Sequence, residues 1–294
     1  MYNWTIRYLR ETVNRTFRDE GKSVMRKLTV TWLSLGLLLC APPLFAAQIG
    51  GEYQPQVGQE GKDVIWVPTP QALVEKMLDM GKVTSRDFVI DLGSGDGRTV
   101  ITAAKRGAKA LGIEYNPDMV ELSKRNAAKQ GVSDRASFVK ADLFESDFSE
   151  ATVITMFLLP DINIRLRPKI LALKPGTRIV SNSFTMGDWS DDETASVKDG
   201  CASYCTAHLW IVPAKAEGTW QLGDGELTLK QSYQMLSGSL RRGGNNTPIS
   251  NGKLNGDQIT FSIGSMRYSG KVASGSMEGT IGGGGQWKAS LLGK

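Results

Sequence analysis

The chain has 294 residues, of which 40% are hydrophobic, 22% charged and 8% aromatic, so it holds enough apolar material for one or two packed cores. Three cysteines exclude a disulfide-dense scaffold. A single histidine, His208, excludes a metal site built on two imidazoles, and we expect no metal centre.

The formal net charge of +5 is unevenly distributed along the chain. Residues 1–47 and residues 214–294 each carry a net charge of +4, whereas residues 48–213 hold 22 acidic and 19 basic side chains. A region with more acid than base lacks the electrostatic footprint of a nucleic-acid-binding domain. We therefore expect no nucleic-acid partner.

A secretory signal is predicted near the N-terminus. Met25-Arg26-Lys27 precedes an apolar run over residues 28–40 and the small residues Ala46-Ala47, which match a basic region, a hydrophobic region and a cleavage site. Cleavage near Ala46 or Ala47 exports the remainder to a periplasmic or extracellular location, whereas an uncleaved leader anchors the chain and is its membrane contact. Pro42-Pro43 shortens the apolar helix below the ~20 residues that a membrane span needs, which favours cleavage.

Cys201 and Cys205 are the two cysteines that remain after such a cleavage. In an oxidising compartment, cysteines tend to pair. The spacing leaves two alternatives open, a disulfide or two free thiols, because pairing requires a suitable distance and direction between the side chains.

Short apolar runs alternate with amphipathic stretches from Gly81 to Val180, which predicts βαβ units and a parallel sheet. Thr69 and Asn116 are the expected N-caps of two helices that end at Gly81 and Gly131. A third helix runs to about Arg106, and a fourth is expected over residues 162–173 with a bend at its proline. The expected strands cover residues 88–92, 110–114, 137–140, 152–158, 177–181 and 208–212.

The composition changes after Pro213, where 17 of the 33 glycines fall within residues 214–294. Alternating apolar runs separated by Gly-, Asn- and Asp-rich turns predict a small antiparallel sheet or barrel with a packed apolar interior. Three segments follow from this division: an N-terminal extension with the signal peptide (1–47), an α/β domain (48–213) and an all-β domain (214–294).

The chemistry-bearing motif is Gly93-Ser94-Gly95-Asp96-Gly97, which stands between a predicted strand and a predicted helix. Glycines are needed where the chain turns sharply and a ligand approaches the backbone. Arg98 breaks the G-x-G-x-x-G spacing of dinucleotide-binding enzymes. Asp91, just before the loop, would repel a pyrophosphate but suits a cationic or neutral ligand. S-adenosylmethionine, which carries a sulfonium and an ammonium group and no phosphate, is such a ligand.

Two further carboxylates end the next two predicted strands. Glu114 lies 23 residues after Asp91, where a carboxylate can accept hydrogen bonds from both ribose hydroxyls of an adenosine. Asp142 is placed to accept from an adenine amino group. Three carboxylates in register after a glycine loop favour an adenosine-containing, phosphate-free ligand over three solvated strand ends.

These residues resemble the class I S-adenosylmethionine-dependent methyltransferases over about residues 64–213, most specifically in residues 89–98, in Glu114-Tyr115-Asn116-Pro117 and in Asp142-Leu143. The resemblance implies a Rossmann-like methyltransferase sheet of the α/β class, mostly parallel with a terminal antiparallel hairpin. It also implies S-adenosylmethionine as cofactor. The residues expected to bind it are Asp91, Gly93, Ser94, Gly95, Gly97, Glu114, Asn116, Asp142 and Leu143.

Within that superfamily, the chain is similar to the group that includes the mitochondrial protein-lysine methyltransferases of the ATP synthase c-subunit and the ADP/ATP carrier. The shared features are Trp66-Val67-Pro68-Thr69-Pro70, residues 91–98 and the Glu-x-Asn-Pro turn. Residues 157–161 depart from the Asx-Pro-Pro-aromatic motif of many amino-group methyltransferases. The acceptor therefore stays open between a protein lysine and a small molecule.

Asp161 is the candidate for orienting or deprotonating the acceptor, its alternative role being a helix N-cap. The expected acceptor pocket comprises Trp66, Thr69, Asn182 and Phe184, and His208 is expected to be structural rather than catalytic. Two alternatives to a methyltransferase remain. An exported, non-catalytic binding protein is favoured by the leader, because S-adenosylmethionine is made in the cytosol, and an oxidoreductase is compatible with a Rossmann-like sheet.

Overall fold

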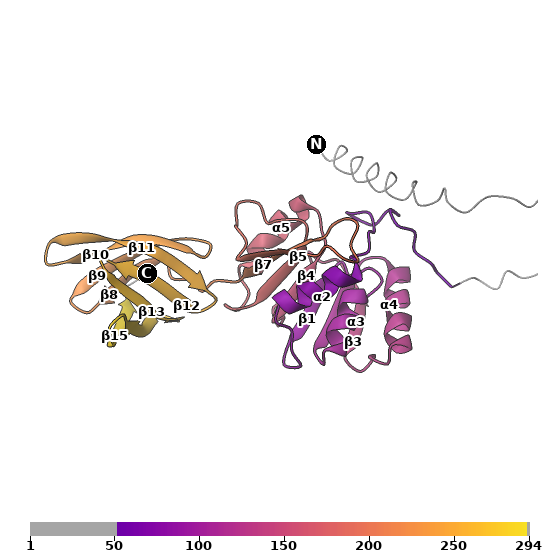
Figure 1. The fold of residues 1–294 in the computed structure, drawn as a ribbon, viewed down its shortest axis with the longest axis horizontal. Helices are drawn as coiled ribbons and strands as arrows, with labels where there is room; N and C mark the ends of the chain where they lie inside the picture. The colour runs from indigo at the N-terminus through magenta and orange to yellow at the C-terminus, as the bar shows by residue number, and fades with distance from the viewer. Residues whose placement is uncertain (1–51, 293–294) are drawn as a thin grey trace, which may run out of the picture. The chain divides into compact units, whose positions relative to one another are not determined.

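The structure is a computed structural model that describes residues 52–292 (Figure 1). The predicted signal segment lies outside the described residues. Residues 52–67 form a turn in which Gly58 N donates to the Trp66 carbonyl oxygen at 2.8 Å, and Pro68 begins one compact unit that contains the remaining elements. Over residues 52–292, every helix is too short or too polar to cross a bilayer.

A seven-stranded sheet with the order β3-β2-β1-β4-β5-β7-β6 forms the first half of this unit. The five strands β1 to β5 are parallel, β7 is antiparallel to β5, and β6 is antiparallel to β7. This arrangement confirms the predicted α/β class and its terminal antiparallel hairpin. The bounds are β1 Phe88–Leu92, β2 Lys109–Glu114, β3 Ala136–Lys140, β4 Val153–Met156, β5 Arg178–Asn182, β6 Glu193–Ser196 and β7 Thr206–Ile211.

Within residues 52–292, four helices connect or precede these strands: α2 Gln71–Met80, α3 Arg98–Lys105, α4 Pro117–Lys129 and α5 Pro160–Ile170. Asn116 caps α4 as predicted, because its side chain accepts from two backbone N–H groups of the first turn. Thr69 does not cap α2, whose N-cap is Pro70. Its hydroxyl instead accepts a hydrogen bond from Asn182 Nδ2 at 3.2 Å, so a tertiary partner replaces the local one.

Helices α2, α3 and α4 cover one face of the sheet. Two apolar clusters record this packing, one around Val89, Val100 and Val120 and a second around Leu73, Met77 and Leu209. The Val- and Ala-rich strands place alternate side chains on this face, and each helix presents an apolar stripe to them. The core thus fixes the strand ends from which the functional loops leave.

Strands β8 to β15 close into an antiparallel barrel (Figure 1), which resolves the predicted choice between an open sheet and a barrel. Closure follows from pairing of β15 with β8. The interior is filled with apolar side chains, including a stacked pair, Phe261 and Tyr268, with Trp287 packed edge-on against both. The bounds are β8 Gly218–Leu222, β9 Gly225–Ser232, β10 Met235–Arg242, β11 Asn245–Asn255, β12 Gln258–Ile263, β13 Met266–Ala273, β14 Ser276–Ile281 and β15 Gly285–Leu291.

Candidate active site

The glycine-rich loop leaves the carboxyl end of β1 and enters α3. Gly93, Gly95 and Gly97 all have positive φ angles, of 77°, 54° and 83°. A Cβ atom on Gly97 would stand 2.8 Å from the Phe138 ring and 2.9 Å from Ser123 Cβ, closer than non-bonded atoms approach. Only glycine meets both demands, the left-handed backbone and the absent side chain.

Glu114 holds this loop from the end of β2. One carboxylate oxygen accepts from Gly95 N at 2.9 Å and the other accepts from Asn116 N, also at 2.9 Å. The carboxylate therefore fixes the glycine loop and the start of α4 at once. Each oxygen can accept a second hydrogen bond, so the carboxylate can still bind a ribose hydroxyl as predicted.

Helix α4 braces the same loop from its buried side. Ser123 Oγ donates to the Gly95 carbonyl oxygen at 2.9 Å, and Asn126 Nδ2 donates to the Asp96 carbonyl oxygen at 3.0 Å. Asp96 forms an ion pair with Arg98, whose guanidinium also donates to the Thr69 carbonyl oxygen. The loop is consequently held by side chains from three elements.

Asp91 is buried at the end of β1 and lacks a cationic partner among the described residues. Burial raises the pKa of its carboxyl group to about 7, against the hydrogen bond that Thr155 Oγ1 donates to it at 2.6 Å. The carboxylates of Glu114 and Asp96 raise this pKa further. A carboxylate kept out of water without a counter-ion is suited to a ligand that carries positive charge.

The remaining residues fit an adenosine sulfonium ligand. Ser94 Oγ is buried without a hydrogen-bond partner, so it can serve a ligand's polar group. Asp142 lies after β3, where its Oδ1 accepts from Phe144 N at 2.9 Å, and Leu143 follows it half-buried. A loop of glycines beside an orphaned hydroxyl and an uncompensated carboxylate is a cradle for a cationic, phosphate-free group.

The predicted acceptor residues are only partly brought together. Thr69 and Asn182 are buried and hydrogen-bonded to each other, and Phe184 follows β5 two residues after Asn182. Asp161 is exposed in the first turn of α5, whose N-cap is Leu159, so its alternative as an N-cap is wrong. Trp66 is half-buried and belongs to a compact unit distinct from the one that begins at Pro68.

His208 lies within β7, away from the glycine loop in sequence. Its Nδ1 is 3.0 Å from Asp191 Oδ2 and 3.2 Å from Thr194 Oγ1. Although burial alone would raise it, the pKa of Asp191 is lowered by hydrogen bonds from Thr194 and His208. These contacts tie two segments of the terminal hairpin together and are compatible with the expected structural role.

Several residues at this edge escaped the sequence prediction. Thr155, Ser123 and Asn126 contact Asp91 or the loop, yet they lie inside apparently ordinary elements. The available signal for Thr155 was its polar side chain in β4, a strand in which all four residues are buried. Phe157 and Tyr204 also lie at this edge, and their proximity depends on tertiary structure alone.

Comparison with known proteins finds methyltransferases. The family model described as the ANTKMT methyltransferase domain matches residues 91–193. A protein-lysine N-methyltransferase of Saccharolobus islandicus is 47% identical over 152 residues, which are 51% of this chain and 94% of that protein. The lysine N-methyltransferase of the ATP synthase c-subunit from Mus musculus is 35% identical over 130 residues, which are 44% of this chain and 52% of that protein.

Among solved structures, an RNA methyltransferase from Salinibacter ruber in complex with S-adenosyl-L-homocysteine shares 44% sequence identity, with a TM-score of 0.48. The alignment covers 51% of this chain and 95% of that one. The chain thus spans nearly all of its Saccharolobus relative but about half of its Mus musculus relative.

A relative that is 47% identical and almost fully covered shares the complete domain, not only a cofactor-binding fragment. Of the three alternatives, this similarity supports the methyltransferase and not the oxidoreductase or the non-catalytic binding protein. The chain belongs to the class I S-adenosylmethionine-dependent methyltransferases, in the group that includes the lysine methyltransferases of the ATP synthase c-subunit and the adenine nucleotide translocase, and its cofactor is S-adenosylmethionine.

Proposed function

We propose that this enzyme transfers a methyl group to the side-chain amine of a protein lysine. The observation that carries the proposal is the 47% identity to a protein-lysine N-methyltransferase over 94% of that protein's length. The acidic balance of residues 48–213 agrees with a cationic acceptor and disfavours a polyphosphate one.

We assign the glycine loop and its surroundings to cofactor binding. S-adenosylmethionine supplies a methyl group on a positively charged sulfur when it is bound. Asp91 offers a negative charge that becomes available as its proton is lost, and Ser94 Oγ offers an unused hydroxyl. Glu114 orders the backbone of the loop through Gly95 N and presents its carboxylate to the ribose.

On the acceptor side, alignment matters more than acid–base chemistry. The lysine nitrogen attacks as the neutral amine, its lone pair forms the new N–C bond, and the electron pair of the broken C–S bond stays on sulfur. A site accelerates such a displacement mainly by aligning the nitrogen with the methyl group and the sulfur. Asp161, which is exposed beside the end of β4, takes the proton that leaves nitrogen or passes it to solvent.

The acceptor is tested with tritium-labelled S-adenosylmethionine and a protein extract of the producing cells, with and without prior acetylation of its amines. We expect label in protein, recovery of Nε-methyllysine after acid hydrolysis, and loss of both after acetylation. The Glu114→Ala variant serves as the matched enzyme with an impaired loop. Label that survives protease but is lost with ribonuclease would show an RNA acceptor instead.

We also propose that the predicted leader exports the chain. The support is the pattern of Met25-Arg26-Lys27, the apolar run and Ala46-Ala47, together with a disulfide between Cys201 and Cys205. Mass spectrometry of the natively produced protein is expected to find a chain that begins near Ala47 or Gln48. An intact chain in the cytosolic fraction would contradict export and would place the enzyme beside its cofactor supply.

A further inference from the structure

Three aromatic side chains meet at the edge of the sheet where the parallel strands end. Phe157 directly follows β4, Phe184 lies two residues after β5, and Tyr204 lies two residues before β7. Because β7 is antiparallel to β5, its first residues lie at the same edge as the last residues of β4 and β5. Ligands of open α/β sheets bind at this edge.

The three rings form one cluster. Their centroids are 5.2 Å apart for Phe157 and Tyr204, 5.9 Å for Phe157 and Phe184, and 6.2 Å for Phe184 and Tyr204. All three side chains are half-buried, so part of each remains accessible. This differs from the fully enclosed aromatic rings of the barrel interior, such as Phe261.

The end of β4 also lies next to the cofactor loop. Leu158 Cδ2 is 3.1 Å from the position that a Cβ on Gly93 would take. Three residues earlier, Thr155 donates its hydrogen bond to Asp91. Phe157, which carries one ring of the cluster, is therefore the chain neighbour of Leu158, the residue that packs against the glycine loop.

Tyr204 adopts a backbone conformation that a bulky side chain rarely takes. Its φ angle is +56°, and Ser183, which precedes Phe184, has φ of +59°. Such conformations persist where the surroundings impose them, and they concentrate at functional sites. Ser183 N donates to the Thr206 carbonyl oxygen at 2.7 Å, so the two unusual residues belong to segments that are bonded to each other.

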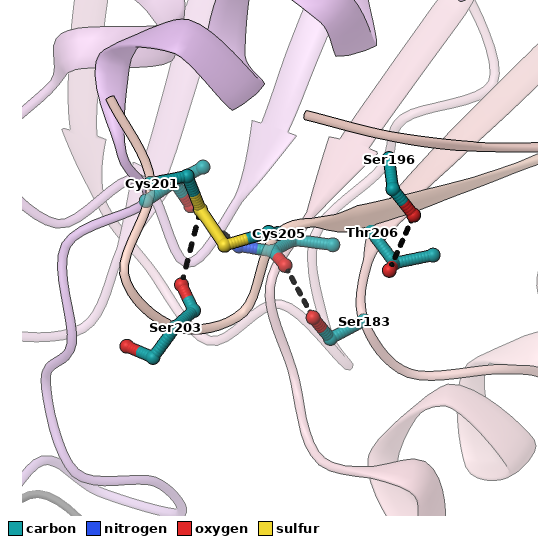
Figure 2. The surroundings of a disulfide bond; sticks show 8 residues. Ser183, Ser196, Cys201, Ser203, Cys205 and Thr206 are labelled. Carbon is teal, nitrogen blue, oxygen red and sulfur yellow. Dashed lines mark hydrogen bonds between the residues drawn. A yellow bond between two sulfur atoms is a disulfide. The ribbon is translucent and has the colours of Figure 1, made fainter. Parts of the chain in front are cut away.

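A disulfide closes the loop that carries Tyr204. Cys201 and Cys205 are bonded, with their Cα atoms 5.8 Å apart (Figure 2). Cys201 Sγ also contacts the Ser203 carbonyl oxygen at 3.4 Å, and Val197 N donates to the Cys205 carbonyl oxygen at 2.9 Å. The bridge thus limits the conformations open to the residue directly before Cys205, which is Tyr204.

We propose that Phe157, Phe184 and Tyr204 form the subsite that receives the methylene stem of the acceptor lysine and binds its nitrogen while this is an ammonium group, before deprotonation and after methyl transfer, and that the Cys201–Cys205 disulfide holds Tyr204 in it. The proposal rests on the proposed lysine acceptor. Aromatic rings attract ammonium groups through their faces and also contact a hydrocarbon stem. In this arrangement Tyr204 determines specificity, and the two cysteines are positioning residues.

The subsite is tested by calorimetric binding of two probes to the full chain saturated with S-adenosylhomocysteine. Nα-acetyl-Nε-trimethyllysine amide carries a permanent cation, and Nα-acetylnorleucine amide is an uncharged counterpart. We expect the cation to bind about tenfold more tightly, and Tyr204→Ala to lose about tenfold while Tyr204→Phe stays within about threefold. Met266→Ala, an exposed barrel residue, is the control. Equal binding of the two probes, or no loss with Tyr204→Ala, would overturn the subsite.

The role of the disulfide is tested by reduction. Dithiothreitol supplies two electrons and two protons to the bridge and leaves two thiols. We expect reduction to weaken probe binding about threefold to tenfold in the native chain, and to have no effect on a Cys201→Ser/Cys205→Ser double variant that already binds at the reduced level. S-adenosylmethionine affinity stays constant throughout. Unchanged probe binding after complete reduction would remove the cysteines from the proposal.

These tests also separate the subsite from the lysine acceptor. Selective binding of the cation together with label confined to RNA would refute the proposed function and leave the aromatic subsite standing. Recovery of methylated lysine together with unchanged probe binding in Tyr204→Ala would support the lysine acceptor and refute the subsite. With a methylated protein in hand, we expect Tyr204→Ala to raise KM for that protein about tenfold and to change kcat by less than about twofold.

Discussion

The sheet half of the chain buries many polar side chains, whereas the barrel buries almost none. Among the described residues, twelve buried polar or charged side chains belong to residues 69–182, and one, Gln234, belongs to the barrel. Even Gln234 serves the sheet half of the chain, since it accepts from Trp189 Nε1 and donates to the Ser190 carbonyl oxygen. Burying polar groups is unfavourable without partners, so the sheet half of the chain has to supply many more internal hydrogen bonds than the barrel does.

Glycine serves different needs in the two regions. In the loop after β1, Gly97 has a positive φ angle and leaves room for Phe138. In the barrel, Gly270 and Gly279 face each other across β13 and β14, where a Cβ would stand 2.0–2.3 Å from backbone oxygens of the neighbouring strand. Glycine therefore lets side chains approach the backbone in the loop, and lets neighbouring strands approach each other in the barrel.

The largest effect is expected from Gly97→Ala. The substitution adds a left-handed alanine and a clash with Phe138 and Ser123, which together cost about 2–5 kcal/mol and displace the loop. We expect S-adenosylmethionine affinity, measured by calorimetry, to fall about 100-fold or more. The matched variant is Gly264→Ala in a barrel turn with φ of +55° and open space around it. Normal cofactor affinity in Gly97→Ala would refute the loop assignment.

Glu114→Ala is expected to have the next largest effect. It removes the acceptor of two backbone N–H groups and the proposed ribose contact, so cofactor affinity should fall by about 10- to 100-fold, or about 1.5–3 kcal/mol. Glu226→Ala, which breaks a surface ion pair with Arg241 in the barrel, should leave that affinity unchanged. A folded Glu114→Ala protein with native affinity would exclude this carboxylate from the site.

The pKa of Asp91 predicts a pH dependence with two parts. The folded chain holds this proton up to about pH 7, whereas the ordinary value is 3.8, so the folded state binds more protons between these values. Asp91 thus makes the free energy of unfolding decrease as the pH rises from about 4 through 7. Cofactor affinity should instead increase about tenfold from pH 6 to pH 8, because a cationic ligand prefers the carboxylate.

Denaturant titrations and calorimetry across this pH range measure both parts. Asp91→Asn is expected to flatten the two profiles, since the amide does not titrate. If the variant keeps the native slopes, another group is responsible. The barrel contains no comparable group among its described residues, so its substitutions should leave both profiles unchanged.

The smallest effect on cofactor binding is expected from removing the barrel. A chain of residues 48–213 retains every residue assigned to the cofactor, so its affinity should stay within about threefold of the full chain. Its thermal stability and solubility should decrease, because Trp189 loses its stacking partner Tyr233, whose ring centroid lies 5.7 Å away. A folded, soluble truncation that fails to bind the cofactor would show that the barrel completes the site.

Most of the parallel sheet could be predicted from sequence, because apolar strands, caps and glycine turns are local signals. β6 escaped prediction, since Glu193–Ser196 is mostly exposed and shows no apolar alternation. The predicted start of α2 was wrong because Asn182, more than a hundred residues away, takes up the Thr69 hydroxyl. Local propensity does not report such distant partners.

The positions of the three candidate carboxylates could be predicted from the sequence, but their contacts only partly. Asp91, Glu114 and Asp142 follow strands in a readable order, whereas the two backbone groups that Glu114 accepts depend on how the loop folds back. The clustering of Phe157, Phe184 and Tyr204 depends on strand order, which places β7 beside β5. Nothing in the spacing of these three aromatic residues indicates that they meet.

Closure of the barrel determines the order in which the two halves of the chain can complete their folding. Strand β8 pairs with β9 next to it and with β15, which lies more than sixty residues further along the chain. The barrel cannot close until its last strand has been synthesised, and contacts of such long sequence separation form slowly. In the sheet, β1 pairs with β2 at a sequence separation of 21 residues and with β4 at 64 residues, and both pairings are available before the barrel strands have been synthesised. The barrel is therefore the last part of the chain to close.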